Sequence, residues 1–368
     1  MEAKTLRPIC SIGMFDFIKG LAIFSVVIGH IFSSCTSAEH YPILYFLTTF
    51  GGILLYGFTI AAGFGIRKLS ARKCFLRIKN MFIVPYVVTA LISTVLSAFN
   101  NFVVSGSVSS AFKQLGISLL RFLLFSDQPV TIFGLTIPHC GSLWFFIAIA
   151  GGWFILNLML NLPQGWKCHL AVILAGVIGY YGNVFLEAHH IGFSFCFFHM
   201  LIFVPGLYIG YLAKKHRWLE KKLPWPYIVL LCVCIAAFLW KYKTPFTLFD
   251  RGNNPLGVFT HFAAAAVSFG LLYLATHINR RETPFINFFE TLGRNSIYIY
   301  CIHSIDYCSI PWTVLRTVAP SSSGVYWFAV TLVLRLAFVG VGILVLNAFQ
   351  SWGGFRHLRE LLSHKKTA

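Results

Sequence analysis

The stretch that decides the fold runs from Phe15 to His30 and reads Phe-Asp-Phe-Ile-Lys-Gly-Leu-Ala-Ile-Phe-Ser-Val-Val-Ile-Gly-His. It opens the first apolar segment long enough to enter a membrane, and it carries Asp16, Lys19 and His30. Ionisable groups are unfavourable in hydrocarbon and usually mark a pathway or a functional site. We therefore expect this segment to be a membrane helix that takes part in the chemistry of the protein.

The spacing of Lys19 and His30 predicts that both side chains lie on the same face of this helix. Their separation is about three helical turns, which at a rise of ~1.5 Å per residue is roughly 16 Å along the axis. Asp16 stands three residues before Lys19, so it can pair with the ammonium group and lower the cost of burying it. Lys19 alone can also be interpreted as a side chain that extends to the membrane interface, whereas His30 lies too deep for that.

The rest of the chain has the composition of a multi-pass membrane protein. Of its 368 residues, 57% are hydrophobic and only 11% are charged. No loop is long enough to form a soluble domain, so we expect residues 1–368 to form one all-α membrane bundle. Runs of about 20 apolar residues predict ten membrane helices, near residues 15–34, 43–65, 81–104, 142–161, 169–186, 193–212, 226–241, 256–277, 296–317 and 326–350. In the longest loop, residues 111–125 form an amphipathic segment expected along the outer interface.

The net charge of +18 is explained by the topology of a membrane protein rather than by binding of a nucleic acid. With the N-terminus inside, 21 of the 29 basic residues fall on the cytoplasmic side, six fall outside and two lie within spans. This alternation is the positive-inside pattern. It predicts that both termini are cytoplasmic and argues against nucleic acid as a partner.

Other polar residues in the expected spans are weaker candidates. His303 and Asp306 can form an imidazole oriented by a carboxylate, or a buried polar pair that joins two helices. Arg335, near the middle of the last span, needs a carboxylate, a set of carbonyls or a ligand anion. Trp144 stands where an outer aromatic belt places tryptophan, so an interface anchor is its simplest interpretation. The ten cysteines lack metal-ligand spacing, and no metal site is expected.

Five motifs together resemble the acyltransferase-3 family of integral membrane acyltransferases. They cover essentially the whole chain in the family's order, and the first and last are the most specific. In the family, the first contains a basic residue, usually Arg, then ten residues and a His. The motifs are Asp16-x-x-Lys19-Gly20 with Val27-Ile-Gly-His30, Phe50-Gly-Gly-Ile-Leu-Leu-Tyr-Gly-Phe-Thr-Ile-Ala-Ala-Gly-Phe64, Arg77-Ile-Lys-Asn-Met-Phe-Ile-Val-Pro-Tyr86, Ser142-Leu-Trp-Phe-Phe146 and Leu292-Gly-Arg-Asn-Ser-Ile-Tyr-Ile-Tyr-Cys-Ile-His303.

Three positions depart from the family pattern. Lys19 replaces the commoner Arg, which keeps the charge but gives up bidentate recognition of phosphate. Ala62 stands where Ser is usual, and Asn80 leaves the third motif without an Arg-x-x-Arg pair. These departures concern the binding of donor phosphates and leave His30 unchanged.

The resemblance implies transfer of an acyl group, often acetyl, from cytoplasmic acyl-coenzyme A to a hydroxyl of a cell-surface carbohydrate or lipid-linked glycan. It implies a multi-pass protein of a bacterial inner membrane, surrounded by membrane lipids, with acyl-CoA as donor substrate and no permanently bound cofactor. The expected site residues are catalytic His30, Asp16 and His303, donor-binding Lys19, Arg72, Lys73, Arg77 and Lys79, and substrate-binding Ser142, Trp144, Asn295, Tyr298 and Arg335.

The geometry of the first helix agrees with this activity. The roughly 16 Å from Lys19 to His30 is about the length of a pantetheine arm, and cytoplasmic cations suit the phosphates of the donor. An imidazole titrates near neutral pH, so it is suited to removing a proton from a hydroxyl. A mechanism through a covalent acyl-histidine intermediate is the alternative. A transporter or flippase of a lipid-linked glycan would use the buried charges as a proton relay, and an inactive scaffold is the third possibility.

Overall fold

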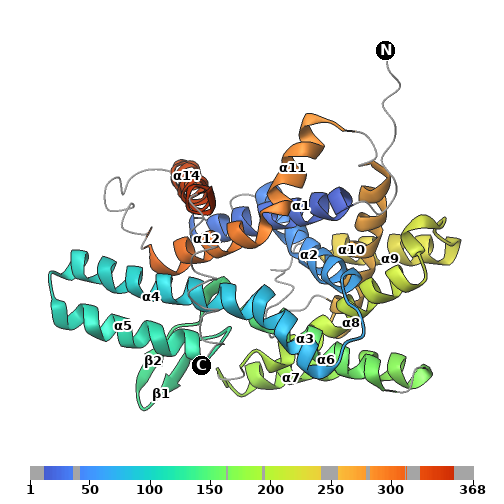
Figure 1. The fold of residues 1–368 in the computed structure, drawn as a ribbon, viewed down its shortest axis with the longest axis horizontal. Helices are drawn as coiled ribbons and strands as arrows, with labels where there is room; N and C mark the ends of the chain where they lie inside the picture. Colours follow the sequence, from blue (N-terminus) through green and yellow to red (C-terminus); the bar gives the residue numbers. More distant parts are fainter. Residues whose placement is uncertain are drawn as a thin grey trace, which may run out of the picture.

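The computed structural model describes residues 12–35, 42–162, 165–192, 195–241, 256–278, 282–310, 312 and 324–351, and these are mostly helical (Figure 1). Short π- and 3₁₀-turns join several of the helices; one of them, η2 (Lys79–Ile83), makes α3 and α4 continuous. The helices are α1 (Ile12–Cys35), α2 (Pro42–Phe64), α3 (Ala71–Ile78), α4 (Val84–Ser105), α5 (Val108–Leu123), α6 (Trp144–Asn161), α7 (Trp166–Ala188), α8 (Phe197–Lys215), α9 (Trp225–Lys241), α10 (Phe259–Ile278), α11 (Pro284–Arg294), α12 (Ser296–Ser309) and α14 (Gly324–Ser351).

The expectation of a helical membrane protein is confirmed. Within the described ranges, seven helical segments are long and apolar enough to cross a membrane: Gly13–Ile31, Ala71–Ser105, Gly141–Asn161, Trp166–Ala188, Phe197–Lys215, Phe259–Ile278 and Tyr326–Phe349. Two shorter apolar stretches, Ile53–Phe64 and Trp225–Phe238, belong to α2 and α9. The count of ten spans and the cytoplasmic position of both termini stay predictions.

The longest loop contains more structure than expected. The amphipathic segment is helical as α5, which lies beside α4 (Figure 1). After it comes a small antiparallel hairpin of β1 (Val130–Ile132) and β2 (Leu135–Ile137), in which Val130 faces Ile137. Strands of three residues are too short to show a recognisable alternation of apolar and polar residues in the sequence.

The ninth expected span is shorter than predicted and has a separate helix in front of it. The described part of α12 ends at Ser309, and a helix of fourteen residues is only ~21 Å long. The helix in front of it, α11, begins where Thr283 accepts a hydrogen bond from the Ile286 backbone N–H and Pro284 occupies the first turn. Residues 311 and 313–317 of the predicted span lie outside the described residues.

α1 lies between α2 and α11, and its contact with α11 is close because a glycine occupies each side of the crossing. A Cβ atom added to Gly20 would overlap the backbone carbonyl of Phe289, and one added to Gly293 would overlap that of Asp16. This packing holds the Asp16–Lys19 turn of α1 against the junction of α11 and α12.

Replacing Gly293 with alanine is therefore expected to destabilise the protein. The new methyl group meets backbone atoms that cannot rotate away, and overpacking of this kind typically costs ~1–3 kcal/mol. We expect a lower melting temperature in detergent and a smaller fraction of monodisperse protein. Gly116→Ala on α5 is the matched control, since its Cβ would have no heavy atom within 4 Å. Equal melting temperatures for the two variants would contradict the close crossing of α1 and α11.

Candidate active site

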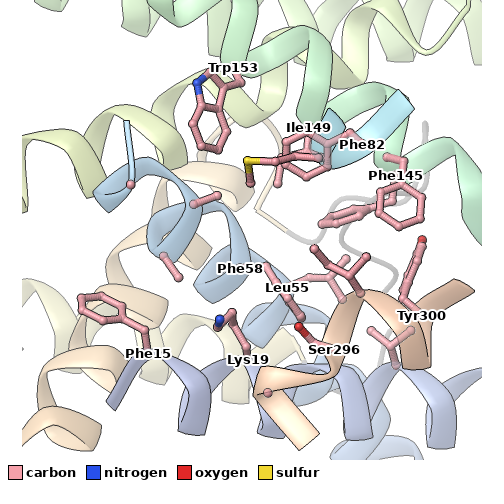
Figure 2. Close-up of a pocket in the computed structure, with 18 of the residues that line it drawn as sticks. Phe15, Lys19, Leu55, Phe58, Phe82, Phe145, Ile149, Trp153, Ser296 and Tyr300 are labelled. Atoms are coloured by element: carbon pink, nitrogen blue, oxygen red, sulfur yellow. The ribbon is translucent and has the colours of Figure 1, made fainter. Parts of the chain in front are cut away.

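A cavity of about 270 Å³ lies between α1, α2, α6 and α12, with the α3–η2 segment along one side (Figure 2). Its walls are mainly apolar and include Phe58 of α2, Phe145 and Trp153 of α6, and Tyr300 of α12. Figure 2 shows Lys19 reaching into this space from α1. The cavity is thus bordered by the first and last motifs of the sequence.

One end of the cavity is cationic. Lys19, Arg77 and Arg294 all line it. The Lys19 ammonium lies 2.5 Å from the Asp16 carboxylate, and its side chain keeps 30% exposure while that of Asp16 keeps 4%. The Arg77 guanidinium lies 5.5 Å from the centre of the Trp153 ring. Arg294 is also paired, with the buried Glu290 carboxylate at 3.9 Å. Three cations against two carboxylates leave this end with an excess of positive charge, which suits an anionic ligand.

A fourth cation, Lys214 of α8, stands close to the same end. Its ammonium lies 5.7 Å from the centre of the Phe64 ring, and that ring packs at 4.6 Å against Phe15, which lines the cavity. Arg77 is close enough to Lys214 to act on it electrostatically. The cationic end therefore combines side chains from α1, α3, α8 and α11.

At the opposite end, the cavity leads toward two histidines in contact. His30 Nδ1 lies 2.9 Å from His303 Nε2, and the two rings are stacked at 5.2 Å. Val26 and Tyr300 line the cavity, and each histidine stands about one helical turn further along the same helix. The side-chain partner of His30 is thus His303, on a helix far away in the chain, and the sequence did not reveal this contact.

A buried carboxylate lies next to this histidine pair. Asp306 Oδ2 lies 3.7 Å from His303 Nδ1 and accepts a hydrogen bond of 2.6 Å from Arg335 Nε. Asp306 Oδ1 accepts a second hydrogen bond of 2.6 Å from Trp312 Nε1. His303 and Asp306 are fully buried, and Arg335 keeps 1% exposure. The partner that Arg335 required is thus Asp306.

Only some of the residues predicted to bind the donor line the cavity. Lys19 and Arg77 line the cavity, whereas the remaining three are exposed and do not: Arg72, Lys73 and Lys79. Sequence reasoning missed Arg294 and Lys214. Arg294 stands inside the last motif, immediately before Asn295, but the sequence does not show that it lines the same cavity as Lys19.

Four of the residues predicted to bind substrate lie outside the cavity lining: Ser142, Trp144, Asn295 and Tyr298. Ser142 Oγ lies 2.7 Å from Ser304 Oγ, beside His303. Trp144 packs its ring at 4.8 Å from that of His199. Asn295 Nδ2 donates to the Thr291 backbone carbonyl of α11, and Tyr298 is 39% exposed.

Asp16 lies far from the histidine pair, although the sequence placed both in one catalytic group. It stands fourteen residues before His30 on α1, which is ~21 Å along the axis. Its carboxylate pairs with Lys19 at the cationic end. This position suits a residue that holds Lys19 in place better than one that transfers a proton at His30.

A comparison with protein families agrees with this arrangement. The model of the acyltransferase-3 family, described as an acyltransferase domain, matches residues 12–349. No curated protein and no solved structure gives a significant match. The matched range includes the cationic end, the apolar walls and the histidine pair with Asp306. The chain therefore belongs to the acyltransferase-3 family and is a membrane acyltransferase.

Proposed function

We propose that this acyltransferase moves an acyl group, most simply acetyl, from cytoplasmic acyl-coenzyme A to a hydroxyl of a cell-surface carbohydrate or lipid-linked glycan. The observation that supports this most is the cavity that runs from a cationic end toward the His30–His303 pair, which lies about one helical turn beyond its lining. Such a cavity suits a long donor with phosphates at one end and a reactive thioester at the other.

The donor fits the cavity in one direction. Its nucleotide phosphates would bind Lys19, Arg77 and Arg294 through charge-assisted hydrogen bonds. The pantetheine arm would pass along the apolar walls, which include Phe58 and Phe145. The roughly 16 Å from Lys19 to His30 then brings the thioester near the histidine pair.

The chemistry at that end needs one base. His30 removes the proton from the acceptor hydroxyl as its oxygen attacks the thioester carbonyl carbon. A C–O bond forms, the C–S bond breaks, and the proton passes from His30 to the sulfur, so that free coenzyme A leaves. A neutral imidazole suits both steps because it first accepts and then returns the proton.

The proposal is tested by measuring acceptor-dependent release of coenzyme A. Purified protein in nanodiscs receives radiolabelled acetyl-CoA and a panel of short oligosaccharides and polyprenyl-linked saccharides. We expect label in the saccharide that mild alkali removes, as an O-acyl ester requires, together with an equal amount of free thiol. In a second assay the same protein is placed in sealed vesicles and the saccharide itself carries the label. Accumulation of that saccharide inside the vesicles without ester formation would favour a transporter or flippase.

A further inference from the structure

We infer that Asp306, held by Arg335 and Trp312, is a positioning residue that acts through His303 to keep His30 ready to accept a proton. The inference rests on the proposed function, in which His30 is the base. It assigns Arg335 to the support of His30 rather than to a substrate. The sequence placed Arg335 among the substrate-binding residues and left open whether Asp306 orients His303 or only joins two helices.

Three contacts in series carry this inference. Arg335 Nε donates to Asp306 Oδ2 at 2.6 Å, the same oxygen faces His303 Nδ1 at 3.7 Å, and His303 Nε2 meets His30 Nδ1 at 2.9 Å. The series joins α14 to α12 and α12 to α1. The gap of 3.7 Å is longer than a hydrogen bond, but contacts of this kind often tighten only when substrate is bound.

The carboxylate of Asp306 determines which nitrogen carries each proton. A carboxylate facing His303 Nδ1 favours a proton on that nitrogen, which leaves His303 Nε2 as an acceptor. His30 must then donate from Nδ1. Its Nε2 then carries no proton, which is the form that a general base requires.

Arg335 and Trp312 hold Asp306 in the orientation that this arrangement needs. Each donates to a different carboxylate oxygen, at 2.6 Å in both cases. A buried carboxylate without such partners would be strongly unfavourable in its charged form. With both donors in place, Asp306 can stay charged beside His303. The ring of Tyr307 contacts both Arg335 and His30. The Arg335 guanidinium lies 5.7 Å from the ring centre, and the His30 ring is stacked on it at 4.9 Å.

Other titratable groups also face the histidine pair, and they do not replace Asp306. His139, in the loop before α6, acts on His30 electrostatically. Its Nδ1 accepts a hydrogen bond from the Gly141 backbone N–H at 3.1 Å. Burial, and then the nearby Arg121 guanidinium, lower the pKa of His139. His139 is therefore neutral at neutral pH, and Asp306 is the carboxylate that faces the pair among the described residues.

The test compares Asp306→Asn, Arg335→Met and the double variant that carries both substitutions. Each single variant is expected to lower kcat at least ~10-fold, because it removes or releases the carboxylate that orients an essential imidazole. The KM for acyl-CoA should stay at the wild-type value, since neither residue lines the cavity. The pH dependence of kcat should change in the same variants.

The double variant separates positioning from structural support. It contains no unpaired buried charge, so its melting temperature should return toward that of the wild type, while kcat should stay low because the carboxylate is missing. Recovery of kcat in the double variant, or normal kcat in Asp306→Asn, would overturn the inference. A raised KM for the acceptor with normal kcat in Arg335→Met would instead make Arg335 a substrate ligand. Absence of transfer by the wild-type protein would overturn the proposed function itself.

Discussion

Replacing His30 with glutamine is expected to lower kcat for acyl transfer by about 10²–10⁴-fold, the usual contribution of a positioned general base. Glutamine keeps a hydrogen-bond donor that can reach His303, but it has no basic nitrogen. The KM for acyl-CoA should change little, because His30 lies about one helical turn beyond the cavity lining. The measurement is the rate of coenzyme A release at saturating donor and acceptor.

A histidine outside the site provides the control for this substitution. His277 on α10 is exposed and contacts the Tyr273 carbonyl of its own helix, with its Nδ1 at 2.9 Å. His277→Gln should keep the wild-type rate. If purified His30→Gln, with a wild-type melting temperature, also kept most of its turnover, His30 would be a structural residue and the mechanism would be wrong.

The membrane helices could be predicted because the bilayer imposes a simple requirement on their length and polarity. α1 and α6 illustrate this, since both lie where apolar runs placed them. α12 begins at Ser296, where the ninth span was predicted to begin, but the separate helix α11 in front of it was not predicted. Both helices are short, and the backbone contact of Gly293 with α1, rather than an apolar period, decides how they pack.

The candidate site was predictable only where one helix decides its geometry. Lys19 and His30 share α1, so the helical period alone places them on one face. His30 and His303 are 273 residues apart in the chain, and only the packing of α1 against α12 brings them together. Arg72 and Arg77 look equivalent in a sequence, since the positive-inside pattern counts charges without regard to helix face.

The difference between Arg77 and Arg72 predicts how the donor is bound. Arg77→Gln should raise the Kd for acetyl-CoA by roughly 10- to 150-fold, because the loss of one charge-assisted contact costs on the order of 1.5–3 kcal/mol. Arg72→Gln is the matched control, since it removes the same charge from the same helix at an exposed position outside the cavity. Its Kd should stay within about twofold of the wild type, as expected for a screened surface charge. Binding is measured calorimetrically in nanodiscs.

A donor without phosphates provides the second half of this prediction. S-acetylpantetheine keeps the arm and the thioester but carries no anionic group, so it should bind the wild type weakly and Arg77→Gln equally weakly. The large difference between the two proteins should therefore appear only with the phosphorylated donor. We choose Arg77 over Lys19 for this test because removing Lys19 would leave the carboxylate of Asp16 buried without its ion-pair partner. If Arg72→Gln and Arg77→Gln weakened acetyl-CoA binding equally, the cations would act only through the overall positive potential of this surface. The cavity would then no longer define where the phosphates bind.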